Sequence, residues 1–160
     1  MPYYKPTNQV VKNVTGLSRL SKQLARFNAI SNGPSAYKID TNEINSISLT
    51  FKKNNIDGHM SLRKFWHNYL PTLQFYNPTL PINVTRVRIG NRRGEKIQSL
   101  YSQVPCELSI KFKKGEDKII DCKNKDPSII FREFIASTNA KKIPQDDLII
   151  IKHPSEKAAY

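Results

Sequence analysis

The sequence predicts an α/β fold in which a β-α-β unit is followed by a β-β-α unit. Three observations lead to this prediction: an alternating apolar strand from residue 47, an apolar stripe at helical spacing from residue 62, and an alternating hairpin from residue 106 with a capped helix behind it. The chain has 160 residues, which fits one domain with extensions and leaves little room for two independent cores.

The first strand and the first helix are both amphipathic. Ile47, Leu49 and Phe51 alternate with hydroxyl residues, so the strand has one apolar face. After a turn over residues 54–58, apolar residues recur at the spacing of a helix that packs one face on a sheet: Leu62, Phe65, Trp66, Tyr69 and Leu73. We expect these residues to form the core, and we expect Pro71 to kink the helix or to restart it.

A second strand follows this helix. Asn77-Pro78 ends the helix, and Ile82, Val84 and residues 87–89 have the pattern of a strand. The crossover is long enough to make this strand parallel to the first. Residues 90–103 then form a long connection with room for one helical turn.

The third and fourth strands form an antiparallel hairpin. Residues 106–112 alternate cleanly, Lys114-Gly115 turns the chain, and residues 119–122 return. With the turn at this place, Cys106 falls opposite about Lys123, so the thiols of Cys106 and Cys122 are diagonal neighbours. We interpret both cysteines as small strand residues.

The last helix and the tail complete the order of elements. Asp126-Pro127 combines an N-cap residue with proline at the first helical position, and the helix behind it carries Phe131 and Phe134. Beyond about residue 137 we expect a tail, in which Leu148–Ile151 can add an edge strand. The predicted division is an arm over residues 1–44, a domain over 45–138 and a C-terminal tail over 139–160.

This order of elements is the core of the thioredoxin-like fold. The hairpin followed at once by a capped helix strengthens the match, whereas order alone leaves the ferredoxin-like sandwich as a rival. Val104-Pro105 stands just before the third strand, where thioredoxin-like proteins commonly carry a cis-proline. We therefore predict a cis peptide at this position.

The charge of the chain points to a polyanionic partner. It carries 26 Lys and Arg against 13 Asp and Glu, a net charge of +13, and such an excess most often serves nucleic acid binding. No carboxylate precedes Asp40. Apolar residues at helical spacing predict a basic amphipathic helix in this arm, with Arg19, Lys22 and Arg26 on one face. The composition of the arm is also that of a mitochondrial import signal.

Several classes of protein lack support in the sequence. No phosphate-binding, dinucleotide-binding, zinc-protease or nucleophile-elbow motif occurs, and no apolar run approaches the length of a membrane span. His59, His67 and His153 have no metal-ligand spacing with the cysteines, so we predict no metal and no cofactor. A conventional enzyme is the weaker hypothesis.

One run of residues resembles a known family. The run is Gly58-His59-Met60-Ser61-Leu62-Arg63-Lys64-Phe65-Trp66, then Asn68-Tyr69-Leu70-Pro71, then Tyr76-Asn77-Pro78-Thr79-Leu80-Pro81-Ile82. Over about residues 46–137 the chain resembles the thioredoxin-like family shared by small mitochondrial ribosomal proteins of both subunits and one small accessory subunit of respiratory complex I. Phe65-Trp66 and the closing Asn-Pro-x-x-Pro are most similar to the fungal large-subunit member.

The resemblance implies a non-enzymatic constituent of the mitochondrial ribosome in the matrix, with mitochondrial rRNA and neighbouring mitoribosomal proteins as partners and no small-molecule substrate. A small-subunit protein and the complex I subunit stay open as alternatives, although docking on protein alone gives no reason for an acid-free arm. A redox thioredoxin is disfavoured, because its cysteines sit in the loop after the first strand and residues 54–60 contain none.

The candidate RNA-binding residues are the arginines and lysines of the arm, of the first domain helix and of the connection after the second strand. Arginine forks match phosphate oxygens, and Tyr101 nearby can stack on an unpaired base. The set is Arg19, Lys22, Arg26, Arg63, Lys64, Arg86, Arg88, Arg92, Arg93 and Lys96.

Overall fold

The computed structural model describes residues 19–88 and 94–152. The chain divides into two compact units, which are described separately. The helical unit comprises residues 19–38, 67–77 and 141–152 of the described chain, and the sheet unit comprises residues 39–66, 78–88 and 94–140. The helical unit is therefore assembled from three segments that are distant in the sequence.

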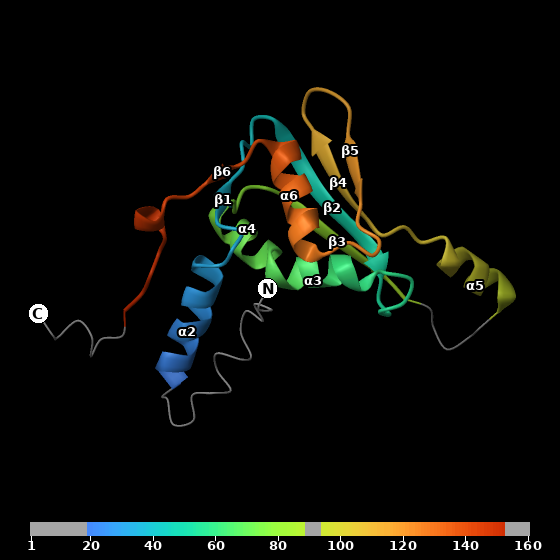
Figure 1. The fold of residues 1–160 in the computed structure, drawn as a ribbon, viewed down its shortest axis with the longest axis horizontal. Coiled ribbons are helices and arrows are strands. Elements are labelled where there is room, and N and C mark those ends of the chain that lie inside the picture. The colour runs from blue at the N-terminus through green and yellow to red at the C-terminus, as the bar shows by residue number, and fades with distance from the viewer. Residues whose placement is uncertain (1–18, 89–93, 153–160) are drawn as a thin grey trace, which may run out of the picture. The chain divides into compact units, whose positions relative to one another are not determined.

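The sheet unit contains a four-stranded mixed sheet (Figure 1). Its strands are β2 (Ile44–Lys52), β3 (Ile82–Val87), β4 (Glu107–Phe112) and β5 (Lys118–Asp121), in the order β3-β2-β4-β5. β2 pairs parallel with β3 and antiparallel with β4, and β4 pairs antiparallel with β5. The predicted α/β class, the parallel crossover and the hairpin are confirmed.

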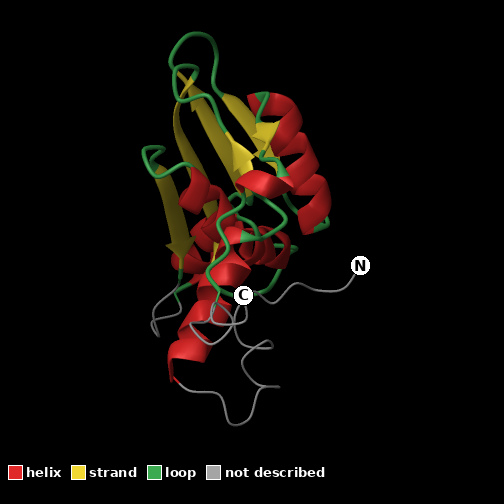
Figure 2. Ribbon diagram, turned by 90° about the vertical axis from the view of Figure 1, so that its left-hand side faces the viewer, coloured by secondary structure: helices red, strands yellow, loops and turns green. Residues whose placement is uncertain are grey.

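Two helices cover one face of this sheet. They are α3 (Met60–Asn68) and α6 (Pro127–Thr138), and the Phe65 ring of α3 meets the Phe134 ring of α6 with 6.4 Å between centroids. Seen from the side, helices lie on one side of the strands (Figure 2). The predicted cap of α6 is confirmed, because an Asp126 carboxylate oxygen accepts a hydrogen bond of 2.8 Å from the Ser128 N–H.

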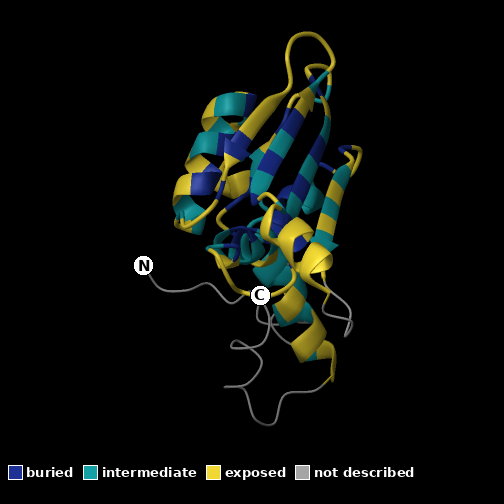
Figure 3. Cartoon of the chain, turned by 90° about the vertical axis from the view of Figure 1, so that its right-hand side faces the viewer, coloured by how far each residue is buried: buried dark blue, intermediate teal, exposed yellow. Residues whose placement is uncertain are grey.

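The core lies between the sheet and these helices. Ile47, Leu49 and Phe51 of β2 are fully buried, and the register places Leu49 beside Val84 and Leu108 on the same face. Buried and more exposed positions alternate along the strands (Figure 3), as expected for a sheet with one apolar face. Of the residues predicted for the core, Leu62, Phe65 and Leu73 are buried, whereas Trp66 and Tyr69 are half-buried.

The helix that we expect to kink or to restart at Pro71 restarts there. α3 ends at Asn68, and α4 (Leu70–Tyr76) begins two residues later with Pro71 in its first turn, where the missing N–H costs nothing. The division between the sheet unit and the helical unit lies just before this restart, between Trp66 and His67 near the end of α3.

In the helical unit α4 packs against α2 (Arg19–Ser31), the predicted amphipathic helix. The Phe27 and Phe75 rings meet edge to face with 5.4 Å between centroids. The Thr72 hydroxyl donates a hydrogen bond of 2.7 Å to the Ile30 carbonyl oxygen, and the Tyr76 hydroxyl donates one of 2.7 Å to Ser31. These bonds satisfy carbonyl oxygens at the C-terminal end of α2, because no further helical turn follows to donate N–H groups to them.

A two-stranded sheet also belongs to the helical unit. β1 (Tyr37–Lys38) pairs antiparallel with β6 (Lys141–Lys142), and a short 3-10 helix follows at Gln145–Asp147. The predicted edge strand at Leu148–Ile151 is wrong in its position, since the tail pairs through residues 141–142 instead. The backbone of residues 149 and 151 bonds to side chains, not to a strand.

Three further expectations are corrected. The connection after β3 contains α5 (Glu95–Ser102), which is longer than the single turn expected. The Val104-Pro105 peptide is trans, the form favoured wherever packing does not impose the other. Cys106 lies directly opposite Cys122, because a loop over residues 113–117 replaces the expected tight turn and shifts the register by one residue.

Close packing at Gly33 yields a test of the helical unit. A Cβ atom added there would lie 2.0 Å from the Thr72 hydroxyl oxygen. We expect Gly33→Ala to lower the free energy of unfolding by about 1–3 kcal/mol, as overpacking does. Combining it with Thr72→Ala removes the clashing oxygen, so urea denaturation should show the double variant to be less destabilised than the sum of the single variants. Additive losses would contradict this packing.

Candidate functional site

The predicted basic face of α2 is present. Arg19, Lys22 and Arg26 are all exposed, and their spacing of three and four residues places them on one side of the helix. A different side of the helix carries Phe27, which packs on α4. Because α2 holds no acidic residue, the cations have no neutralising partner within their own helix. This face is suited to an anionic partner.

The two-stranded sheet adds cations that sequence reasoning missed. Lys38 and Lys141 are directly opposite each other, Lys142 follows, and all three are exposed. Like charges at opposite positions of a strand pair are destabilising, and an anion bound there would relieve the repulsion. The Lys141-Lys142 doublet was a visible signal, but its pairing with Lys38 joins residues about a hundred positions apart and could not be read from the pattern.

The helical unit as a whole is strongly basic. Its described residues include two acids, Asp146 and Asp147. Against these stand seven cations, which gives a net charge of 7 − 2 = +5: Arg19, Lys22, Arg26, Lys38, Lys141, Lys142 and Lys152. Both acids lie in the 3-10 helix, so the remaining described parts of the unit carry cations alone.

In the sheet unit Arg86 differs from the exposed arginine that the sequence suggested. It pairs in register with Phe51, which puts its side chain on the helix-covered face. Its guanidinium carbon lies 5.1 Å from the centroid of the Trp66 ring, a cation–π contact. The Arg86 Nε atom is buried and has no hydrogen-bond partner among the described residues. Arg86 therefore contributes to packing at the edge strand.

The other cations after β3 are more accessible. Arg88 is exposed directly after the strand, and Lys96 is exposed on α5. Arg92 and Arg93 lie outside the described residues. The two ends of the predicted basic connection thus present exposed cations, while Arg86 is directed to the helix-covered face.

Arg63 and Lys64 are engaged within the sheet unit. An Arg63 guanidinium nitrogen donates a hydrogen bond of 2.9 Å to the side-chain oxygen of Asn55. Lys64 is half-buried, and its charge helps to lower the pKa of Asp126, although hydrogen bonds from Ser128 are the larger cause. Both residues contribute to local structure, which makes them weaker candidates for a partner than the exposed cations of α2.

A further group of cations occupies the β4–β5 hairpin and was not among the predicted residues. The exposed lysines here are Lys111, Lys113, Lys114 and Lys118. Glu116 and Asp117 lie between them, so the net charge of the hairpin tip is lower than that of α2. The sequence indicates this group of cations, because four lysines occur within eight residues.

At the end of β2 a buried lysine connects two segments of the sheet unit. Lys52 is 1% exposed, its ammonium lies 2.7 Å from an Asp57 carboxylate oxygen, and it also lies 5.1 Å from the centroid of the Tyr101 ring. The hydrogen bond from Lys52 lowers the pKa of Asp57. One ammonium thus contacts both the loop before α3 and the last turn of α5, the helix that carries Lys96.

His59 belongs to the same cluster. It is 2% exposed, and its Nδ1 accepts a hydrogen bond of 3.1 Å from the backbone N–H of Lys52. Burial, and then the charge of Lys52, lower the pKa of His59 below its ordinary 6.5, which Asp57 offsets in part. His59 therefore fixes the loop before α3 to the end of β2 by accepting this backbone hydrogen bond.

The thiols are unsuited to redox chemistry. The loop between β2 and α3 contains no cysteine, and both Cys106 and Cys122 are free and buried on the hairpin. Burial raises the pKa of Cys106 to about 11 and that of Cys122 to about 12, so neither is an appreciable thiolate at neutral pH. No cluster of metal-ligating side chains occurs among the described residues. Within the same residues, no helix is long and apolar enough to cross a membrane.

The fold and the surface define a small α/β protein whose exposed functional groups are mainly the cationic side chains of lysine and arginine. Residues 62–127 match the family described as mitochondrial ribosomal protein L51 / S25 / CI-B8 domain. The chain is 35% identical to the large ribosomal subunit protein mL61 of Saccharomyces cerevisiae over 136 residues, which cover 83% of this chain and 93% of that protein. It is 30% identical to mL61 of Neurospora crassa over 116 residues, or 61% of this chain and 57% of that protein. The chain belongs to the mL61 family of mitochondrial ribosomal proteins.

The buried histidine predicts a pH dependence of stability. Because the pKa of His59 is lowered in the folded protein, the unfolded chain binds a proton first as the pH falls through 6.5. Stability should therefore decrease on acidification from pH 7.5 to 5.5, by at most about 1.4 kcal/mol per pH unit from this group. The measurement is thermal unfolding across that range, above the titration of the carboxylates.

Two variants separate this effect from the rest of the chain. His59→Asn keeps a hydrogen-bond acceptor without a titrating group, so its stability should depend less on pH in this window. His67 is exposed, and His67→Asn should behave like the parent. Equal pH dependence of the His59 variant and the parent would contradict the assignment.

Proposed function

We propose that this protein is a structural constituent of the large subunit of the mitochondrial ribosome. The observation that carries the proposal is the similarity to mL61 of Saccharomyces cerevisiae, which extends over 93% of that protein and 83% of this chain. A match confined to the sheet would support a shared fold alone, whereas this one includes the helical extensions.

Ribosomal RNA is the proposed partner of the exposed cations. Duplex and folded RNA present closely spaced phosphates, and arginine and lysine side chains bind them with release of counterions. The face of α2 is the best candidate surface, because Arg19, Lys22 and Arg26 are exposed and unneutralised within their helix. Lys38, Lys141 and Lys142 extend the candidate set in the helical unit, and Arg88, Arg92, Arg93 and Lys96 provide the one in the sheet unit.

The proposed role is scaffolding without catalysis, in the mitochondrial matrix, beside other proteins of the subunit. The sheet supports a thioredoxin-like assignment. Its strand order is β3-β2-β4-β5, as in the core of that fold, and α3 and α6 pack on the same face of the sheet. The position where a redox member of that fold holds cysteines is occupied by the Lys52–Asp57–His59 cluster. This fold would serve as a rigid body that presents charge.

The alternatives left open by the sequence receive less support. Both relatives are named as large-subunit proteins, which favours that subunit over the small one. A complex I subunit would dock on protein and would not need the acid-free face of α2.

Sedimentation tests the proposed function. The tagged protein, expressed in fungal mitochondria in place of its mL61 relative, should comigrate with the large ribosomal subunit in a sucrose gradient and shift to the top after nuclease digestion of the rRNA. Comigration with the small subunit, or with complex I in detergent extracts, would contradict the proposal.

The arginines after β3 offer a quantitative test of RNA binding. We expect the triple variant Arg88→Gln, Arg92→Gln, Arg93→Gln to bind large-subunit rRNA fragments more weakly. The salt slope of log K should fall by roughly 0.7–0.9 for each phosphate that the variant no longer neutralises. Arg86 is left unchanged because it packs on Trp66. Filter binding over a salt series measures both the affinity and the slope.

Arg132→Gln is the matched control for this variant. Arg132 is an exposed arginine of α6 outside the proposed surface, so its replacement should change neither the affinity nor the slope. Unchanged binding by the triple variant would show that these arginines are a solvated surface. Equal losses of affinity in the triple variant and the control would show that only total charge matters.

A further inference from the structure

The segment after the 3-10 helix has apolar side chains that are exposed to solvent. It reads Leu148-Ile149-Ile150-Ile151, and its three isoleucines are 49%, 60% and 39% exposed in order. β-branched residues favour strands, yet this segment pairs with no strand of the described chain. Three adjacent exposed isoleucines form an apolar row of the kind that marks interaction sites.

The backbone of this segment is held by side chains of the helical unit. The Asn28 amide makes a reciprocal pair with Ile151: its nitrogen donates to the Ile151 carbonyl at 2.9 Å, and its oxygen accepts from the Ile151 N–H at 2.9 Å. The Ile149 N–H donates to the Tyr76 hydroxyl at 3.3 Å. Bonds at residues two apart, directed to the same body, are the pattern of an extended chain.

The alternate residue leaves an open edge. In an extended chain the N–H and carbonyl of Ile150 point away from the side used by residues 149 and 151. Ile150 has no hydrogen bond among the described residues. The backbone of the segment is thus bonded on one side by Asn28 and Tyr76, and its other side is open to pair with a strand of a partner.

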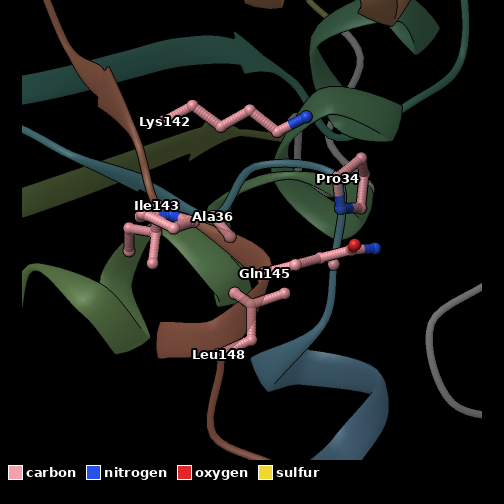
Figure 4. Close-up of a pocket in the computed structure, with 8 residues that line it drawn as sticks. Pro34, Ala36, Lys142, Ile143, Gln145 and Leu148 are labelled. Atoms are coloured by element: carbon pink, nitrogen blue, oxygen red, sulfur yellow. The ribbon is translucent and has the colours of Figure 1, made fainter.

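A hollow with both polar and apolar lining adjoins the segment. It has a volume of about 570 Å³, and the apolar side chains of Pro34, Ile143 and Leu148 line it together with Lys142 and Gln145 (Figure 4). Leu148 belongs to both features, so the hollow is continuous with the row of isoleucines. A strand laid on the open side could place an apolar side chain in it.

Two acidic residues beside the segment favour a protein over RNA as its partner. Asp146 and Asp147, the acids of the helical unit's described residues, directly precede the segment, and Lys152 directly follows it. Phosphates are repelled beside the two aspartates, and isoleucine side chains offer nothing to a phosphate backbone. A protein strand with apolar residues along its length and a lysine or arginine at the end facing these aspartates satisfies both features.

We propose that residues 148–151 are a docking strand for a neighbouring protein of the large subunit, which adds an extended, apolar segment to the open side and places a cation beside Asp146 and Asp147. The proposal rests on the proposed function, because it takes the partner from the same subunit. The α2 face would then bind RNA, and this strand would bind protein.

Hydrogen exchange of the Ile150 amide tests the added strand. In the free protein this amide should exchange fast, while the amides of Ile149 and Ile151 are slowed. In purified large subunits that contain the protein, strand addition should slow Ile150 by about tenfold or more. An Ile150 amide that exchanges equally fast in both states overturns the proposal, while comigration of the protein with the subunit preserves the proposed function. Failure to comigrate overturns both.

A photo-crosslinking residue in place of Ile150 identifies the occupant in assembled subunits. A crosslink to an apolar segment with an adjacent lysine or arginine in one ribosomal protein is the expected result; a crosslink to rRNA or to lipid overturns the proposal. Ile150→Lys should reduce incorporation several-fold. The control Ile119→Lys alters an isoleucine that is 61% exposed on β5, and it should incorporate like the parent. Equal incorporation of both variants contradicts the docking strand.

Discussion

The sheet unit depends on the burial of one strand. β2 pairs with β3 on one side and with β4 on the other, and Ile47, Leu49 and Phe51 on its covered face are fully buried under α3 and α6. Burying such side chains contributes roughly 1.5–3 kcal/mol each. This strand and its neighbours supply the core, to which the buried Lys52 and the packed Arg86 also contribute, whereas Arg88 and Lys96 are exposed to a partner.

At the end of β2 a charged side chain is buried in the packing of the sheet unit. Lys52 continues the strand into the interior, and its ammonium is satisfied by Asp57 and the Tyr101 ring. A buried ammonium is costly unless it is paired, so this contact fixes the loop before α3 and the end of α5 together.

Much of this architecture was predictable from local pattern. Alternation located β2, β4 and β5, proline placed the restart at Pro71, and Asp126-Pro127 placed the start of α6. The misses involve long-range pairing: the hairpin loop shifted Cys106 opposite Cys122, and the tail paired at Lys141–Lys142. Of the candidate site, the exposure of Arg19, Lys22 and Arg26 followed from helical spacing, whereas the contact of Arg86 with Trp66 required the register.

We propose that the exposed cations of this protein bind ribosomal RNA within the large mitochondrial subunit. Ultraviolet crosslinking of purified subunits, followed by mass spectrometry of nucleotide-bearing peptides, tests this binding. We expect crosslinked peptides from the α2 face around Lys22 and from the connection between Arg88 and Lys96. Subunits that contain the protein but yield no nucleotide on either segment would contradict it.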